Sequence, residues 1–71
     1  MNNTFKLLDV VALLKDVPQQ KLAVGQVGTI VEVLNDNSFL IEFCNNKGET
    51  LSMVSVKAED LLLLHYELIA A

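Results

Sequence analysis

The feature that most constrains the fold is a pair of β-type runs, residues 27–34 and 38–43, separated by Asn35-Asp36-Asn37. Asn and Asp suit a chain reversal because their short side chains tolerate left-handed backbone and bond to it locally. A three-residue loop would pair Leu34 with Ser38, Val33 with Phe39, Val31 with Ile41 and Thr29 with Phe43. Opposite residues of an antiparallel pair share one face of the sheet. The predicted core face therefore consists of Val27, Val31, Val33, Phe39, Ile41 and Phe43.

The other face of this hairpin carries Ile30, Leu34 and Leu40 beside two glutamates. This face is too apolar to be left open to water, so we expect something to cover part of it. Two explanations remain open at this point. Either the C-terminal residues of the same chain fold back over it, or a partner protein does.

Upstream of the hairpin, the apolar residues of 7–14 fit a helical spacing as well as a buried strand, and we predict a strand. Pro18 ends that element, and residues 16–23 are expected to form a polar loop. Gly25 and Gly28 bracket the start of the next strand, where a missing side chain permits positive φ or a close approach of two backbones. We therefore expect the chain to bend sharply where it enters the sheet.

Downstream, Asn45-Asn46-Lys47-Gly48 predicts a second reversal with a bulge. In residues 49–56 the apolar alternation changes phase after Met53, which predicts a bend that passes the strand from one sheet to another, as in small barrels. Residues 57–60 should form a helical turn and Leu61-Leu62-Leu63-Leu64 a short last strand. An amphipathic helix over the C-terminal residues is the alternative.

Length and composition limit the organisation of the chain. At 71 residues it is expected to form a single domain over 1–71, with a core at about 8–64 and a tail at 65–71. The hydrophobic fraction of 52% is high for so small a protein, so we expect some apolar surface to meet a protein partner or a second copy in a dimer. The net charge of −4 and the scattered lysines disfavour binding to nucleic acid.

Cysteine use and hydropathy indicate a cytoplasmic protein. Cys44 is the only cysteine, so no intramolecular disulfide forms, whereas small secreted scaffolds usually carry several. The N-terminal residues do not have the pattern of a secretory signal. The longest apolar run, Leu61 to Leu64, is far shorter than the roughly 20 residues that a membrane-spanning helix needs. No membrane association is expected.

The order of these segments resembles a family of small bacterial proteins catalogued only as a domain of unknown function. The resemblance covers residues 8–64 and rests on 9–16 with the following Pro18, on Gly25-x-x-Gly28-Thr29-x-Val31-x-Val33-Leu34, on 41–43 and on 58–62. It implies an all-β fold, a small SH3-like barrel of five strands with one helical turn before the last strand. The glycine-containing second strand also resembles the KOW element of ribosomal and transcription elongation proteins. The family brings no agreed catalytic residues.

The polar residues do not assemble into an evident catalytic or metal site. Cys44 has no basic neighbour and is expected to be a small, at least half-buried hydrophobe. His65 lies near the C terminus without a positioned partner, and Glu32 and Glu42 are expected on a solvated rim. We therefore predict no enzymatic activity, cofactor, metal or small-molecule substrate.

A non-enzymatic protein-binding module, such as the small partner or inhibitor in a two-protein pair, is the favoured function. The alternatives are a KOW-like module that contacts nucleic acid and a non-catalytic subunit of an enzyme complex. The predicted protein interface comprises Ile30, Leu34, Leu40, Leu64, His65, Tyr66, Leu68 and Ile69. An aromatic groove for proline-rich peptides is not expected, because the chain lacks Trp.

Overall fold

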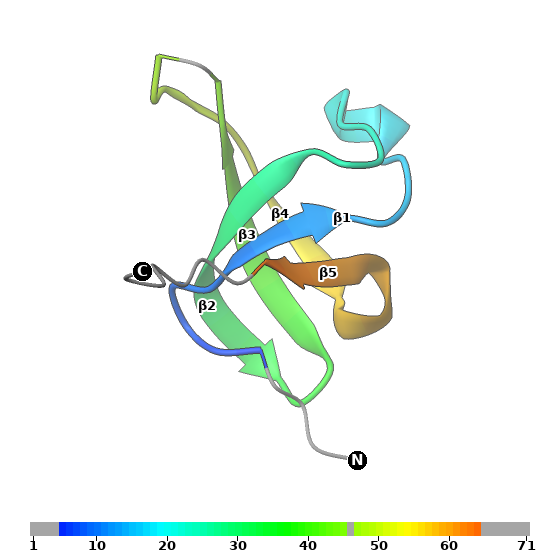
Figure 1. The fold of residues 1–71 in the computed structure, drawn as a ribbon, viewed down its shortest axis with the longest axis vertical. Coiled ribbons are helices and arrows are strands. Elements are labelled where there is room, and N and C mark those ends of the chain that lie inside the picture. The colour runs from blue at the N-terminus through cyan, green and yellow to red at the C-terminus, as the bar shows by residue number, and fades with distance from the viewer. Residues whose placement is uncertain (1–4, 46, 65–71) are drawn as a thin grey trace, which may run out of the picture.

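The computed structural model describes residues 5–45 and 47–64 of the 71-residue chain, and these form one five-stranded antiparallel sheet. The strands are β1 (Val10–Leu13), β2 (Val27–Asn35), β3 (Ser38–Cys44), β4 (Thr50–Lys57) and β5 (Leu61–Leu64). Their order across the sheet is β4-β3-β2-β1-β5, which leaves β4 and β5 as its two edges (Figure 1). The helical elements of the described residues are two single 3-10 turns, η1 (Pro18–Gln20) and η2 (Ala58–Asp60). The prediction of an all-β fold with five strands and one helical turn before the last strand is confirmed.

The β2–β3 hairpin keeps the predicted pairing of Val33 with Phe39 but differs in its register elsewhere. Asn35 pairs with Ser38, so the loop has two residues rather than three, and its amide Asn37 N donates to Asn35 Oδ1 at 2.8 Å. A register shift between Ile30 and Glu32 leaves the residue between them outside the regular pairing. Ile30 therefore pairs with Ile41 and turns toward the core.

This shift corrects the predicted core face. Phe39, Ile41 and Phe43 are fully buried as predicted, and so is Ile30, which the regular alternation had placed on the opposite face. The three valines predicted to share the core face do not: Val27 and Val33 are exposed and Val31 is half-buried. The sequence could not indicate this change because Ile30 and Val31 are equally apolar and adjacent.

The core lies inside the curve of the sheet. Its other members come from β1, β4, β5 and the long loop before β2: Val11, Leu13, Leu22, Val56 and Leu61. Phe5 closes one end of the core with its ring centroid 5.4 Å from that of Phe39. Gly28 is required here, because a Cβ at this position would lie 2.6 Å from Ile41 Cγ2 and 2.8 Å from the Phe43 ring. The space left by the missing side chain of Gly28 is occupied by two side chains rather than by a second backbone, and Gly25 has the predicted positive φ, of 90°.

β4 lies with the other four strands in one sheet, so the predicted bend between two sheets is wrong, although a register shift opposite Phe43 and Cys44 leaves Leu51 outside the regular pairing. Ser52, Val54 and Val56 point inward in unbroken alternation and pair with Phe43, Ile41 and Phe39. Leu51 and Met53 lie on the outer face, each 53% exposed. The apparent change of phase in the sequence arose because the outer face of this strand is itself apolar.

The two short strands resolve the ambiguities of the terminal regions. Residues 10–13 form a strand, as predicted, although it is shorter than the run 7–14. Leu61–Leu64 is also a strand, paired antiparallel with β1, so the helical alternative is wrong for these four residues. The second reversal is present, with Gly48 at a φ of 80° and a register shift next to Cys44. The tail 65–71 lies outside the described residues.

Candidate protein-interaction surface

A tight turn before β1 presents two leucines to solvent. Asp9 N donates to the Lys6 carbonyl at 3.0 Å, and Lys6 N donates to Asp9 Oδ2 at 2.7 Å, so the turn is closed by one backbone bond and one carboxylate. Leu8 N donates to the Ile30 carbonyl at 2.8 Å, and Ile30 N donates to the Asp9 carbonyl at 2.9 Å. These bonds fasten the turn to β2. Leu7 and Leu8 at its tip are consequently held in place by backbone contacts rather than by burial.

Leu8 occupies a backbone conformation that leucine rarely adopts. Its φ is 73°, in the left-handed region that favours Gly or Asn. Such strain typically costs on the order of 1 kcal/mol and concentrates at functional sites. The Leu8 side chain does not recover this cost by burial, since it is 70% exposed. A strained and exposed leucine is the feature of this molecule that most suggests a contact with another molecule.

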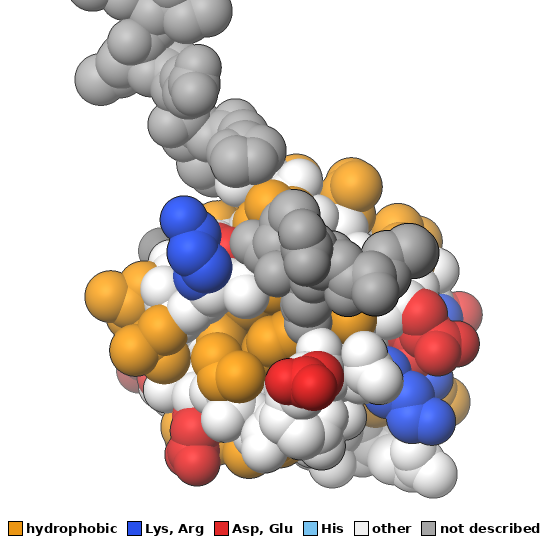
Figure 2. All heavy atoms as spheres, turned by 90° about the horizontal axis from the view of Figure 1, so that it is seen from below, with side chains coloured by type: hydrophobic (Ala, Val, Ile, Leu, Met, Phe, Trp, Pro, Cys, Tyr) orange, Lys and Arg blue, Asp and Glu red, His pale blue; other side chains and the backbone are white. Residues whose placement is uncertain are grey.

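Further exposed apolar side chains lie at the same end of the molecule. Leu7 is 55% exposed, and Val33 and Leu34 at the end of β2 are 48% and 43% exposed. Both segments lie toward the lower end of the view in Figure 1. Figure 2, seen from below, shows several groups of hydrophobic side chains at this end, with acidic and basic side chains between and around them. We call Leu7, Leu8, Val33 and Leu34 the turn surface.

The structure separates the residues predicted for the interface. Leu34 is exposed and belongs to the turn surface, whereas Leu40 and Leu64 are half-buried. Ile30 is fully buried in the core, so its prediction as an interface residue is wrong. His65, Tyr66, Leu68 and Ile69 lie outside the described residues. Leu7 and Leu8 were missed because no Gly, Asn or Pro marks the turn that exposes them.

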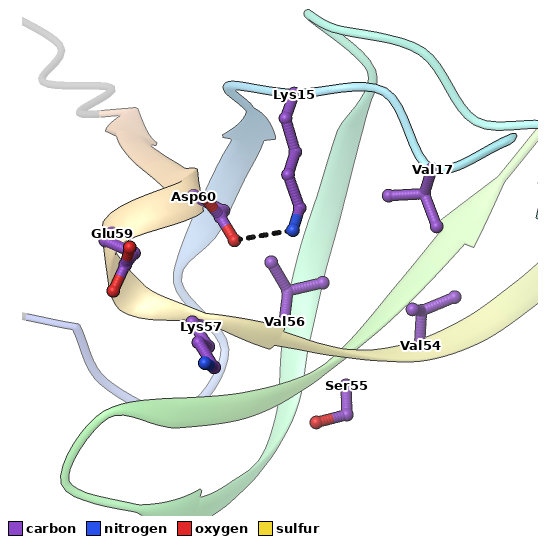
Figure 3. A pocket seen from close by; sticks show the side chains of 8 residues that line it. All are labelled: Lys15, Val17, Val54, Ser55, Val56, Lys57, Glu59 and Asp60. Carbon is purple, nitrogen blue, oxygen red and sulfur yellow. Dashed lines mark ion pairs between the residues drawn. The ribbon is translucent and has the colours of Figure 1, made fainter.

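A pocket of about 320 Å³ lies between β4, η2 and the loop that follows β1 (Figure 3). Its apolar wall consists of Val17, Val54 and Val56. Lys15 reaches across from the loop, and its Nζ lies 3.0 Å from Asp60 Oδ2. Because both side chains are partly exposed, this ion pair contributes at most about 1 kcal/mol to stability. It ties the loop to η2 beside the edge of β4.

The side chains considered for chemistry are dispersed. Cys44 is exposed at the end of β3, which corrects the prediction that it is at least half-buried. Glu42 accepts a hydrogen bond from Thr50 Oγ1 at 2.5 Å, and Glu32 is exposed. Among the described residues, no three His, Cys, Asp or Glu side chains come together in a group that could hold a metal ion. Nor does any helix in this part of the chain have the length and apolar character to cross a membrane.

Comparison with known proteins decides the family. The model of a domain of unknown function, DUF4926, matches residues 7–63. The chain belongs to this family. The matched range contains β1 to β4, all of β5 except Leu64, and the four residues of the turn surface. No curated protein and no solved structure matches the chain significantly.

Proposed function

We propose that this DUF4926 protein is a non-enzymatic protein-binding module that docks a partner on the turn surface. The observation that carries the proposal is Leu8, a leucine held at positive φ by three backbone bonds of its turn and yet 70% exposed. A leucine side chain that is strained and solvated in the free protein gains favourable burial when a partner covers it.

The amount of exposed apolar surface supports the same function. Among the described residues, ten large hydrophobic side chains are exposed, and the buried core consists of ten hydrophobic residues of which one is an alanine. Contiguous apolar patches on a monomer usually mark binding sites. The partner expected for the turn surface is a protein with an apolar groove or patch. A basic rim on that partner would complement the net charge of −4.

We also infer an SH3-like relationship for the fold and a bacterial, cytoplasmic setting as the small member of a two-protein pair. The order of five short strands, the long loop after β1 and the turn η2 before β5 support the first. Exposure of Cys44 as a free thiol is compatible with a reducing compartment. KOW-like binding to nucleic acid is less favoured because Lys15 is already paired with Asp60.

The test compares capture of partners by three tagged proteins from a native lysate of the source cell. Leu8→Gly removes the side chain at a position whose φ suits glycine, so the fold should be kept. Val24→Ser is the matched control, because Val24 is also exposed but lies in the loop before β2. The wild type and Val24→Ser should retain the same stoichiometric protein, and Leu8→Gly should lose it. Equal retention by Leu8→Gly, or no stoichiometric protein with any of the three, would refute the proposal.

A further inference from the structure

The outer edge of β4 carries unpaired backbone groups. β4 has β3 on one side and no strand on the other (Figure 1). Ala58 N donates to the Asn37 carbonyl at 2.8 Å, so these two residues form a hydrogen-bonded pair. Bonded pairs alternate along an antiparallel ladder, and Val54 and Val56 therefore bond to β3 as well. The residues between and after them direct their N–H groups to the open edge: Met53, Ser55 and Lys57.

This part of the edge is regular and free. The register shift of β4 lies between Thr50 and Ser52, so residues 52–57 keep an even pairing with β3. No turn, loop or cap hydrogen bond within the described residues engages the amides of Met53, Ser55 and Lys57. A free edge of this kind pairs with another extended backbone. The ligand chemistry that matches it is a β-strand.

The pocket in Figure 3 lies beside the same stretch of β4. Val54 and Val56 line it from β4, and Val17 lines it from the loop after β1. Opposite residues of two paired strands share one face of the sheet. A residue opposite Val56 on an added strand would therefore present its side chain to this pocket. The pocket volume of about 320 Å³ leaves room for a branched apolar side chain.

Lys57 adds a charge beside the open edge. Figure 3 shows its side chain on the side of β4 opposite to Val54 and Val56. It is exposed and forms no ion pair within the described part of the chain, not even with the neighbouring Glu59. A carboxylate opposite Lys57 on an added strand would lie on the same face and form a cross-strand ion pair. The edge therefore favours an acidic residue at that position.

We propose that the edge of β4 binds an extended segment of a partner protein, in which an acidic residue directly precedes a branched apolar residue. The segment runs antiparallel to β4, the more stable orientation, with the acidic residue opposite Lys57 and the apolar residue opposite Val56. A free edge of a second copy does not supply this sequence, because neither edge strand of the described residues, β4 or β5, contains an acidic residue. This site differs from the turn surface and does not rest on the proposed function.

Selection from a displayed library of random peptides about ten residues long tests the sequence of the segment. Wild type should enrich an acidic residue directly before Val, Ile or Leu. Lys57→Glu should enrich a basic residue in its place, because like charges on opposite residues repel. Lys47→Glu changes the net charge equally in the loop at the other end of β4, and it should select the same peptides as wild type. No enriched pattern with wild type, or the same pattern with Lys57→Glu, would overturn the proposal.

Titration of the enriched peptide to about 1 mM into the isotope-labelled chain locates the site by NMR. The amides of Met53, Ser55 and Lys57 should shift saturably and exchange more slowly. Methylating the backbone nitrogen of the residue after the apolar one removes the donor to the Ser55 carbonyl, and it should weaken binding at least about tenfold. Methylating the apolar residue itself is the matched control, because its N–H points away from β4. Equal affinities of the two methylated peptides would contradict strand pairing and overturn the proposal.

Two further measurements separate this site from the other surfaces. Leu8→Gly should bind the peptide as tightly as wild type, and a weaker affinity would place the peptide on the turn surface and overturn the proposal. In concentrated protein without peptide, the amides of Met53, Ser55 and Lys57 should still exchange rapidly. Their protection there would show that a second copy occupies the edge, which would also overturn the proposal.

Discussion

β3 and β4 are neighbouring strands of similar length, yet they have opposite relationships to solvent. β3 has a strand on each side and buries Phe39, Ile41 and Phe43 completely. β4 has one neighbour, buries only Val56 fully and leaves two large apolar side chains half-exposed on its outer face. The comparison teaches that burial, and hence stability, is concentrated in β3, which has a neighbouring strand on each side. The edge strand keeps apolar surface and backbone groups available for association.

The largest expected effect is a core truncation in β3. Phe43→Ala should cost about 3–5 kcal/mol in the free energy of unfolding, since it removes a fully buried ring. The matched change in β4, Leu51→Ala, should cost less than about 1 kcal/mol because Leu51 is exposed. Urea denaturation measures the free energy of unfolding of both variants. A similar loss of unfolding free energy in the two variants would contradict the conclusion that β3 contributes more buried surface than β4.

Gly28→Val should cost more than about 1 kcal/mol, because its Cβ would overlap Ile41 and the Phe43 ring. Gln20→Ala, in the exposed turn η1, is the control and should change stability by less than about 0.5 kcal/mol. Thermal unfolding followed by circular dichroism compares them. Equal melting temperatures would show that β2 does not approach β3 as closely as described.

Asn45→Ala should cost about 1 kcal/mol by removing the acceptor that closes the β3–β4 loop. Asn45 Oδ1 accepts from Lys47 N at 2.8 Å and from Glu49 N at 3.0 Å. Asn35→Ala removes a single such bond in the β2–β3 hairpin and should cost less. Urea denaturation measures the loss of stability in both variants. It thereby compares how strongly side-chain hydrogen bonds stabilise the β3–β4 loop and the β2–β3 loop. A smaller cost for Asn45→Ala would contradict this account of the loop.

The smallest expected effect is that of Leu8→Gly. Relief of strain at positive φ opposes the larger backbone entropy of glycine in the unfolded chain, so stability should stay within about 0.5 kcal/mol of wild type. Leu14→Gly is the matched control, because Leu14 is also exposed but has no positive φ. It should be the less stable variant by about 1 kcal/mol. Equal stabilities would mean that Leu8 carries no strain.

Much of the sheet could be predicted from the sequence. The five strands, the turn before β5 and the roles of Gly25 and Gly28 follow from turn chemistry and apolar alternation. The buried face of β3 was also predictable, since Phe39, Ile41 and Phe43 alternate with more polar residues. These features depend on local patterns that tertiary contacts reinforce.

The register and the interaction surface could not be predicted in the same way. The bulge that brings Ile30 into the core is not marked by Gly or by a polar residue. In β4, the outward-facing residues Leu51 and Met53 are apolar, so the apolar alternation in the sequence looks as if it changed phase although the strand does not change sheet. The turn that exposes Leu7 and Leu8 contains no usual turn former at its tip. In each case the sequence has apolar residues on both sides of the backbone, and only the tertiary pairing decides which of them are buried.

The most direct test of the contrast between a paired and a free side of β4 is amide hydrogen exchange followed by NMR. Because Ala58 N donates to the Asn37 carbonyl and bonded pairs alternate along the ladder, we predict that the amides of Val54 and Val56 bond to β3 and are protected. The amides of Met53, Ser55 and Lys57 face the open edge and should exchange rapidly. Uniform protection along β4, or protection of the second set rather than the first, would contradict the account.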